Sequence, residues 1–154
     1  MVLQQQSEVT FWGWTTHTSE KLTVIASWDN NPVEIEAYQG KWIGKLTTPK
    51  AGGTYTITIK GHEEVVIKNV LIGEVWLGSG QSNMQWTPLQ GLNNAETEIE
   101  NASFPEIRFF QVLQHTALTP QENTKGKWLV CSPETMKNFS SVAYFFGRSM
   151  GLFL

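Results

Sequence analysis

A serine that follows an apolar run is the strongest candidate for chemistry in this sequence. Residues 70–77 are typical of a buried strand, interrupted only by Glu74, and they lead through glycines to Ser82. Glycines allow a sharp turn at positive φ, which would expose the serine hydroxyl at the carboxyl end of the strand, where α/β sheets bind ligands. Such a serine can attack an acyl group while backbone N–H groups hold the oxyanion. The alternative from spacing alone is a turn serine that only satisfies a backbone amide.

Three better-known loops do not fit this segment. A phosphate-binding loop ends in Gly-Lys-Ser/Thr, and no lysine follows Gly80. A dinucleotide-binding loop needs a third glycine, but Asn83 and Met84 end this segment. The nucleophile elbow of α/β-hydrolases needs its second glycine where Met84 stands. The turn therefore belongs to none of these three classes.

Residues 73–84 resemble the nucleophile block of the sialate O-acetylesterases, a family of SGNH-type carbohydrate esterases. They read Gly-Glu-Val-Trp-Leu-Gly-Ser-Gly-Gln-Ser-Asn-Met, where the family has Gly-Glu-Val-Trp-Leu-x-Ser-Gly-Gln-Ser-Asn-Met. Four other segments are similar to family segments in the same order, namely residues 1–5, 11–14, 51–57 and 138–148. The resemblance therefore covers nearly the whole chain, and it corresponds to the N-terminal portion of the family.

The resemblance implies a serine carboxylic-ester hydrolase that removes O-acetyl groups from sialic acids or related glycans. Ser82 would be the nucleophile, its own amide one of the oxyanion donors, and Gly80, Gln81 and Asn83 would support the turn. Acetylated xylan or another acetylated carbohydrate is the alternative substrate. The alternative of another class is a non-catalytic β-sandwich fragment that acts as an interaction module.

The catalytic base that the family implies is absent from these 154 residues. The resemblance places it in a later Asp-x-x-His segment, and further oxyanion donors in a Gly-Gly block and a Gly-Glu-Ser-Asn-type block, none of which occurs here. The single aspartate, Asp29, lies in a predicted turn, and His17 and His62 lie in turn-like polar surroundings. His115 would reach Ser82 only if its loop folded back. We therefore expect a fragment that is inactive in isolation.

The first 72 residues show the pattern of a β-sandwich or jelly-roll-like module. Short segments with period-two alternation are separated by turn-forming residues, and no helix-length periodic segment interrupts them. The predicted strands cover residues 9–11, 22–26, 33–37 and 55–59, and the predicted turns cover 29–32, 39–41 and 50–53. This module also contains four tryptophans, Trp12, Trp14, Trp28 and Trp42. They could form a platform on which sugars stack, but aromatic residues that alternate in strands usually belong to the core.

Residues 73–154 show a different pattern, which predicts the N-terminal, incomplete part of an α/β SGNH-hydrolase domain. After the serine turn we expect a helix within 92–101, strands over 107–112 and 128–131, and a helix capped by Asn138. The apolar face of this last helix would include Val142, Phe145, Phe146 and Phe153. Since later strands are missing, this face should drive self-association or bind a separate polypeptide that carries the Asp-x-x-His segment.

Composition excludes several other classes. The chain is 40% hydrophobic, enough for a core, and its net charge of −3 with scattered signs gives no basic footprint for nucleic acid. No apolar run approaches the about 18 residues of a membrane span. The single cysteine, Cys131, forbids an internal disulfide, and no residues stand at metal-ligand spacing, so we expect neither metal nor cofactor. Met1 leads directly into a polar segment, which does not have the pattern of a signal peptide. The resemblance instead implies a periplasmic or secreted parent protein. The location of the chain itself is therefore open.

Overall fold

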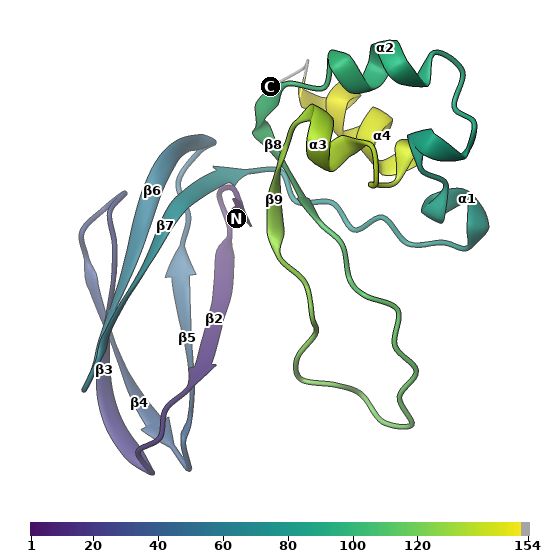
Figure 1. The fold of residues 1–154 in the computed structure, drawn as a ribbon. Helices are drawn as coiled ribbons and strands as arrows, with labels where there is room; N and C mark the ends of the chain where they lie inside the picture. Colours follow the sequence, from purple (N-terminus) through teal and green to yellow (C-terminus); the bar gives the residue numbers. More distant parts are fainter. Residues whose placement is uncertain (152–154) are drawn as a thin grey trace. The chain divides into compact units, whose positions relative to one another are not determined.

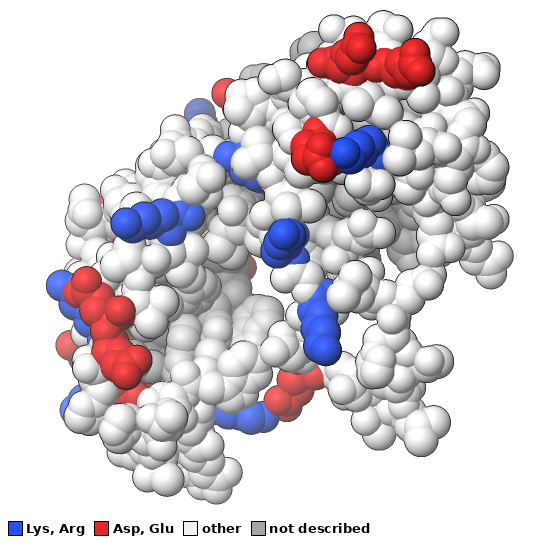
Figure 2. Space-filling model, viewed as in Figure 1, with Lys and Arg blue, Asp and Glu red and all other residues white. Residues whose placement is uncertain are grey.

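A computed structural model describes residues 1–151 of the chain (Figure 1). The chain forms two compact units, an N-terminal unit of residues 1–75 and a C-terminal unit that begins at Trp76. None of the helices in the described part of the chain is long and apolar enough to cross a membrane. On the face shown in Figure 2, basic and acidic side chains are interspersed.

The N-terminal unit is a single seven-stranded sheet. Its strands are β1 (Val2–Gln4), β2 (Glu8–Trp14), β3 (Ser19–Ala26), β4 (Pro32–Tyr38), β5 (Lys41–Thr47), β6 (Gly52–Lys60) and β7 (Glu64–Gly73). They are arranged in the order β1-β7-β6-β3-β4-β5-β2, and every pair is antiparallel except β1 with β7. β4 and β5 are in register only at Tyr38 and Lys41, next to their turn. The prediction of a β-rich module is confirmed.

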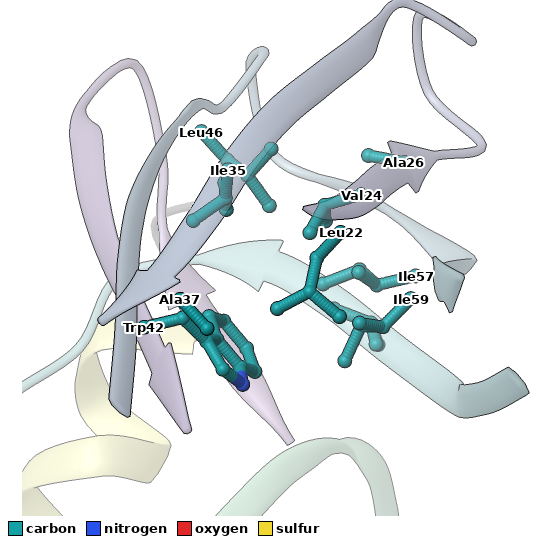
Figure 3. Packing of buried hydrophobic residues seen from close by; sticks show 10 residues of the cluster. Leu22, Val24, Ala26, Ile35, Ala37, Trp42, Leu46, Ile57 and Ile59 are labelled. Carbon is teal, nitrogen blue, oxygen red and sulfur yellow. The ribbon is translucent and has the colours of Figure 1, made fainter. Parts of the chain in front are cut away.

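One hydrophobic core lies inside this curved, nearly closed sheet (Figure 3). Because side chains alternate along a strand, every second residue of β3 points inward, and Leu22, Val24 and Ala26 are all buried. The other strands contribute Ile35, Ala37, Trp42, Leu46, Ile57, Ile59 and Val70 to the same cluster. The sheet therefore wraps around its own core.

The predicted turns of this unit form for specific local reasons. Gln39 and Gly40 both have positive φ, at 52° and 76°, as a tight two-residue turn between antiparallel strands requires. Asn30 also has positive φ, and the Asn31 N–H donates to the Asp29 carboxylate at 3.0 Å. The predicted strands within β2, β3, β4 and β6 are confirmed.

The prediction of one buried strand over residues 70–77 is wrong. β7 ends at Gly73 and belongs to the N-terminal sheet, where Val70 and Ile72 face the core. The side chains of Val75, Trp76 and Leu77 are exposed, and these residues lie in no strand. The strand ends here because the Glu74 carboxylate turns back to the N-terminus, accepting hydrogen bonds from Gln4 at 3.1 Å and Gln5 at 2.8 Å. These bonds lower the pKa of Glu74, that from Gln5 most.

The C-terminal unit combines short helices with one two-stranded antiparallel sheet. Its elements are α1 (Ser82–Gln85), the 3-10 turn η1 (Pro88–Gln90), α2 (Ala95–Glu100), β8 (Phe104–Phe110), β9 (Trp128–Cys131), α3 (Pro133–Met136) and α4 (Ser141–Gly151). Its core contains Ala102, Phe109, Cys131, Met136 and Tyr144. The predicted helix region 92–101 contains α2, the predicted strand 107–112 overlaps β8 but extends two residues beyond its end at Phe110, and the predicted strand 128–131 matches β9. The described residues of this unit form no parallel pair, so the start of an α/β sheet is not confirmed.

The last helix begins at Ser141, and Ser140 caps it in place of the predicted Asn138. The Ser140 hydroxyl accepts a hydrogen bond from the Ala143 N–H at 3.2 Å, which satisfies one of the free amides of the first turn. Tyr144 is fully buried and Phe145 packs against the core, so the apolar face predicted for association is partly covered. Val142 and Phe146 are half exposed, whereas Leu152, Phe153 and Leu154 lie outside the described residues.

Candidate active-site turn

Ser82 is the first residue of α1, and its side chain is exposed. The preceding Gln81 is not helical, and its carbonyl accepts hydrogen bonds from the N–H groups of Met84 at 3.0 Å and Gln85 at 3.2 Å. Within residues 1–151 the Ser82 hydroxyl makes no hydrogen bond, so it does not satisfy a backbone amide. This geometry leaves the oxygen accessible to a second molecule.

The glycines before Ser82 serve close packing, and the prediction that they turn the chain at positive φ is wrong. Among the glycines of the described residues, positive φ angles occur at Gly40, Gly52, Gly53 and Gly91, but not at Gly78 or Gly80. A Cβ added at Gly80 would lie 3.1 Å from the Cβ of Met84, and one at Gly78 would lie 3.4 Å from its sulfur. The absence of a side chain at Gly80 therefore lets the loop pass close to Met84, whereas a Cβ at Gly78 would make only an ordinary contact with the Met84 sulfur.

Both ends of the turn are attached to α4. The Trp86 carbonyl, at the end of α1, accepts a hydrogen bond from the Ser141 N–H at 2.8 Å. The Trp76 ring packs edge-on against the Phe146 ring, with centroids 5.3 Å apart. Between them, the half-buried Met84 accepts a hydrogen bond from the Ser140 hydroxyl. The serine turn is thus held by the first half of α4, which sequence reasoning missed, although Ser140 and Ser141 lie in one of the segments that carry the family resemblance.

Within the C-terminal unit, the described residues place no base in hydrogen-bond contact with Ser82. Residues 75–95 contain no charged side chain, and His115 lies in the exposed segment between β8 and β9, where no hydrogen bond joins it to Ser82 among residues 1–151. Asp29, His17 and His62 belong to the N-terminal unit. His17 and His62 stack on each other there, with ring centroids 4.0 Å apart.

Glu20 is the acidic partner of these two histidines. The Glu20 carboxylate accepts hydrogen bonds from the Thr15 hydroxyl and the backbone N–H of His62. These bonds hold the pKa of Glu20 below the ordinary value, and the Thr15 bond has the largest effect. His17 Nδ1 lies 3.8 Å from the same carboxylate. No group of three or more metal-ligating side chains within residues 1–151 is arranged to hold a metal ion.

Comparison with known proteins identifies relatives that share nearly all of this chain. No family model matches it. It is 29% identical over 166 residues to sialate O-acetylesterase of Rattus norvegicus and 28% identical over 169 residues to that of Homo sapiens. These matches cover 96% and 97% of the chain but only 31% and 32% of the relatives, so the chain spans about a third of the length of the curated relatives it matches.

A solved structure matches the chain equally well. The carbohydrate acetylesterase from Xanthomonas citri aligns with 97% of this chain and 34% of its own, with a TM-score of 0.89 and 29% sequence identity. The described residues therefore have the fold of one third of a carbohydrate acetylesterase.

Proposed function

We propose that this chain, a homologue of sialate O-acetylesterases over nearly its whole length, supplies the nucleophile of a carbohydrate O-acetylesterase. The observation that carries the proposal is Ser82, whose hydroxyl is exposed and free of hydrogen bonds among the described residues, on a turn attached to α4 at both ends. A serine held in this way is accessible and limited in its orientation, as an attacking group must be.

The proposed reaction has two steps. The Ser82 oxygen attacks the acetyl carbonyl, its proton passes to a base, and the sugar hydroxyl leaves with a proton, so that the acetyl group is bound to the serine. Water then attacks this ester and releases acetate. The Ser82 N–H is the first helical amide and has no intrahelical acceptor, so it can donate to the oxyanion in both steps.

Gly80, Gln81 and Asn83 support the turn in this proposal. Gly80 allows the close approach to Met84, and the Gln81 carbonyl binds two amides of α1. The Asn83 carbonyl accepts a hydrogen bond from the Trp86 N–H at 3.3 Å, which closes the short helix. Their contribution is therefore to the position of Ser82.

The base is the missing part. We propose that it is the histidine of an Asp-x-x-His segment that these 154 residues do not contain, so that the 154 residues alone release acetate very slowly. Removal of the base from a serine–histidine pair leaves only the small residual rate due to the oxyanion donors and binding.

Complementation tests this function. The chain is mixed with a segment of a related esterase that carries Asp-x-x-His, and acetate release is measured from O-acetylated sialic acid and from acetylated xylan. We expect Ser82→Ala to abolish the release, whereas Ser79→Ala, an exposed serine in the same loop, keeps it. The preferred substrate decides between a sialic acid and a xylan esterase. Equal acetate release by the native chain and by Ser82→Ala would refute the assignment of Ser82 as the nucleophile.

A further inference from the structure

Large aromatic side chains are exposed on the outer face of the N-terminal unit, on strand β2, which pairs with β5. Trp12 is 57% exposed and Trp14 52%, although aromatics in alternating strands are usually core. The inward position between them is Gly13, where an added Cβ would collide with the indole of the buried Trp42. The core therefore takes Trp42 from β5 and leaves both tryptophans of β2 outside.

The two indoles have apolar and aromatic neighbours on the same face. In the antiparallel register Trp12 lies opposite Ile43 and Trp14 lies opposite Lys41, so these side chains are cross-strand neighbours. Lys41 is also the register partner of Tyr38, which is 75% exposed. Two residues along a strand span about 6.7 Å, so the indoles of Trp12 and Trp14 form a row. We call Trp12, Trp14, Tyr38 and Ile43 the aromatic platform.

An open groove adjoins the aromatic platform. It has a volume of about 480 Å³ and lies where β4 and β5 diverge beyond their single register pair. Ile43 lines the groove as well as the platform, so the two are continuous. Gly44 also lines the groove, and a Cβ added to it would point into the core and collide with Ile35.

The polar groups of the groove suit hydroxyl groups. Glu34 and Glu36 line it from β4, and both are exposed carboxylates that accept hydrogen bonds. The one lysine that lines it, Lys45, is already paired with Glu8 at 2.5 Å. The residues that line the groove carry two carboxylates and one lysine, a net charge of −1, and a polyol can donate hydrogen bonds to both carboxylates.

We propose that the aromatic platform and this groove bind a neutral glycan. Pyranose rings present flat C–H faces that stack on indole and phenol rings, and their hydroxyl groups donate to carboxylates at the edge. The charge of the groove disfavours a sialic acid as the bound sugar. The site consists of residues of the N-terminal unit and uses no residue of the Ser82 turn, so it does not depend on the proposed esterase activity.

Indole N–H resonances of the isotopically labelled chain test the proposal during titration with xylohexaose. We expect the Trp12 and Trp14 resonances to shift, with a dissociation constant of roughly 1 mM or lower. Trp12→Ala and Trp14→Ala should each weaken binding at least about tenfold, which corresponds to about 1.4 kcal/mol, because each removes an indole face on which a sugar ring stacks. Leu113→Ala, which removes a comparably exposed apolar side chain from the C-terminal unit, should not.

Any of four results would overturn the proposal. One is the absence of any shift at Trp12 and Trp14, and a second is an equal loss of binding in Leu113→Ala. A third is that sialyllactose binds the platform as tightly as xylohexaose. The fourth is a concentration-dependent dimer that Trp12→Ala dissociates, because the aromatic platform would then be an interface between two copies of the chain. Thermal unfolding of each variant checks that the exposed substitutions leave the fold intact.

Discussion

The Ser140 hydroxyl lies 3.3 Å from the sulfur of Met84, two residues beyond Ser82 in the sequence. The same hydroxyl caps α4 by accepting the Ala143 N–H. One side chain thus joins the beginning of α4 to the helix that carries the candidate nucleophile.

Loss of this hydroxyl should loosen both elements. We expect Ser140→Ala to destabilise the C-terminal unit by about 1 kcal/mol, the usual effect of removing a helix cap. Native-state hydrogen exchange of the α4 amides and of Met84 measures it. The matched control is Ser141→Ala: the Ser141 hydroxyl is buried and has no hydrogen-bond partner among the described residues, so its removal should be neutral or stabilising. A larger effect at Ser141 than at Ser140 would contradict this role for Ser140.

Two glycines of the C-terminal unit should respond in opposite ways to alanine. At Gly80 the new Cβ would lie 3.1 Å from the Met84 Cβ, so Gly80→Ala should strain the turn and destabilise it by about 1 kcal/mol or more. At Gly147, inside α4, an added Cβ meets nothing within 4 Å, so Gly147→Ala should stabilise the helix by about 0.5–1 kcal/mol. Thermal unfolding of the two variants gives the comparison. If Gly80→Ala were as stable as the native chain, close packing would not explain this glycine.

Stability of the N-terminal unit should fall in acid because of Glu20. The Thr15 hydroxyl and then the His62 N–H lower its pKa in the folded state. A carboxyl whose pKa is lowered by folding contributes stability above its unfolded pKa, and this contribution is lost as the pH falls through the folded pKa. Glu20→Gln should therefore be less stable than the native chain at pH 7, and the difference should shrink below about pH 4.3, the ordinary glutamate value. Glu63→Gln, at an exposed position, is the control. If the difference in stability between Glu20→Gln and the native chain grew as the pH fell, the proposed role of Glu20 would be wrong.

Cys131 should be a poorly reactive thiol. It is buried in the core of the C-terminal unit, and burial raises its pKa, so little thiolate is present near neutrality. We expect iodoacetamide to label the unfolded chain readily and the native chain at least about tenfold more slowly. Equal labelling rates, measured by mass spectrometry, would show that this core opens freely.

Turn chemistry and local alternation predicted much of the N-terminal unit. Gln39-Gly40 predicted a tight turn, and residues 22–26 predicted a strand whose alternate residues are buried. The strand over residues 41–47 was not predicted. It directly follows the turn at Gln39-Gly40, and Gly44 interrupts its alternation of apolar and polar residues. Burial of Trp42 rather than of Trp12 depends on how β2 and β5 fold over the core, and such long-range packing is not visible in local patterns.

The candidate site was located by resemblance, and its supports were not predicted. The segment around Ser82 was recognisable as a sequence motif, but the role of Gly80 depends on Met84 and that of Met84 on Ser140, 56 residues away. The apolar character of residues 70–77 predicts one strand because it is continuous across the end of β7. Only the Glu74 hydrogen bonds to Gln4 and Gln5 show why that strand stops.

Transfer of an acetyl group to Ser82 is the most direct test of the central claim. The chain is mixed with the Asp-x-x-His segment of a related esterase and with 4-nitrophenyl acetate, quenched in acid during turnover, and digested for fragment-ion mass spectrometry. We expect one acetyl group on Ser82 and none on Ser79 in the same peptide, and no acetylated peptide in Ser82→Ala. An acetyl group on another residue, or turnover that continues in Ser82→Ala, would contradict the assignment of Ser82 as the nucleophile.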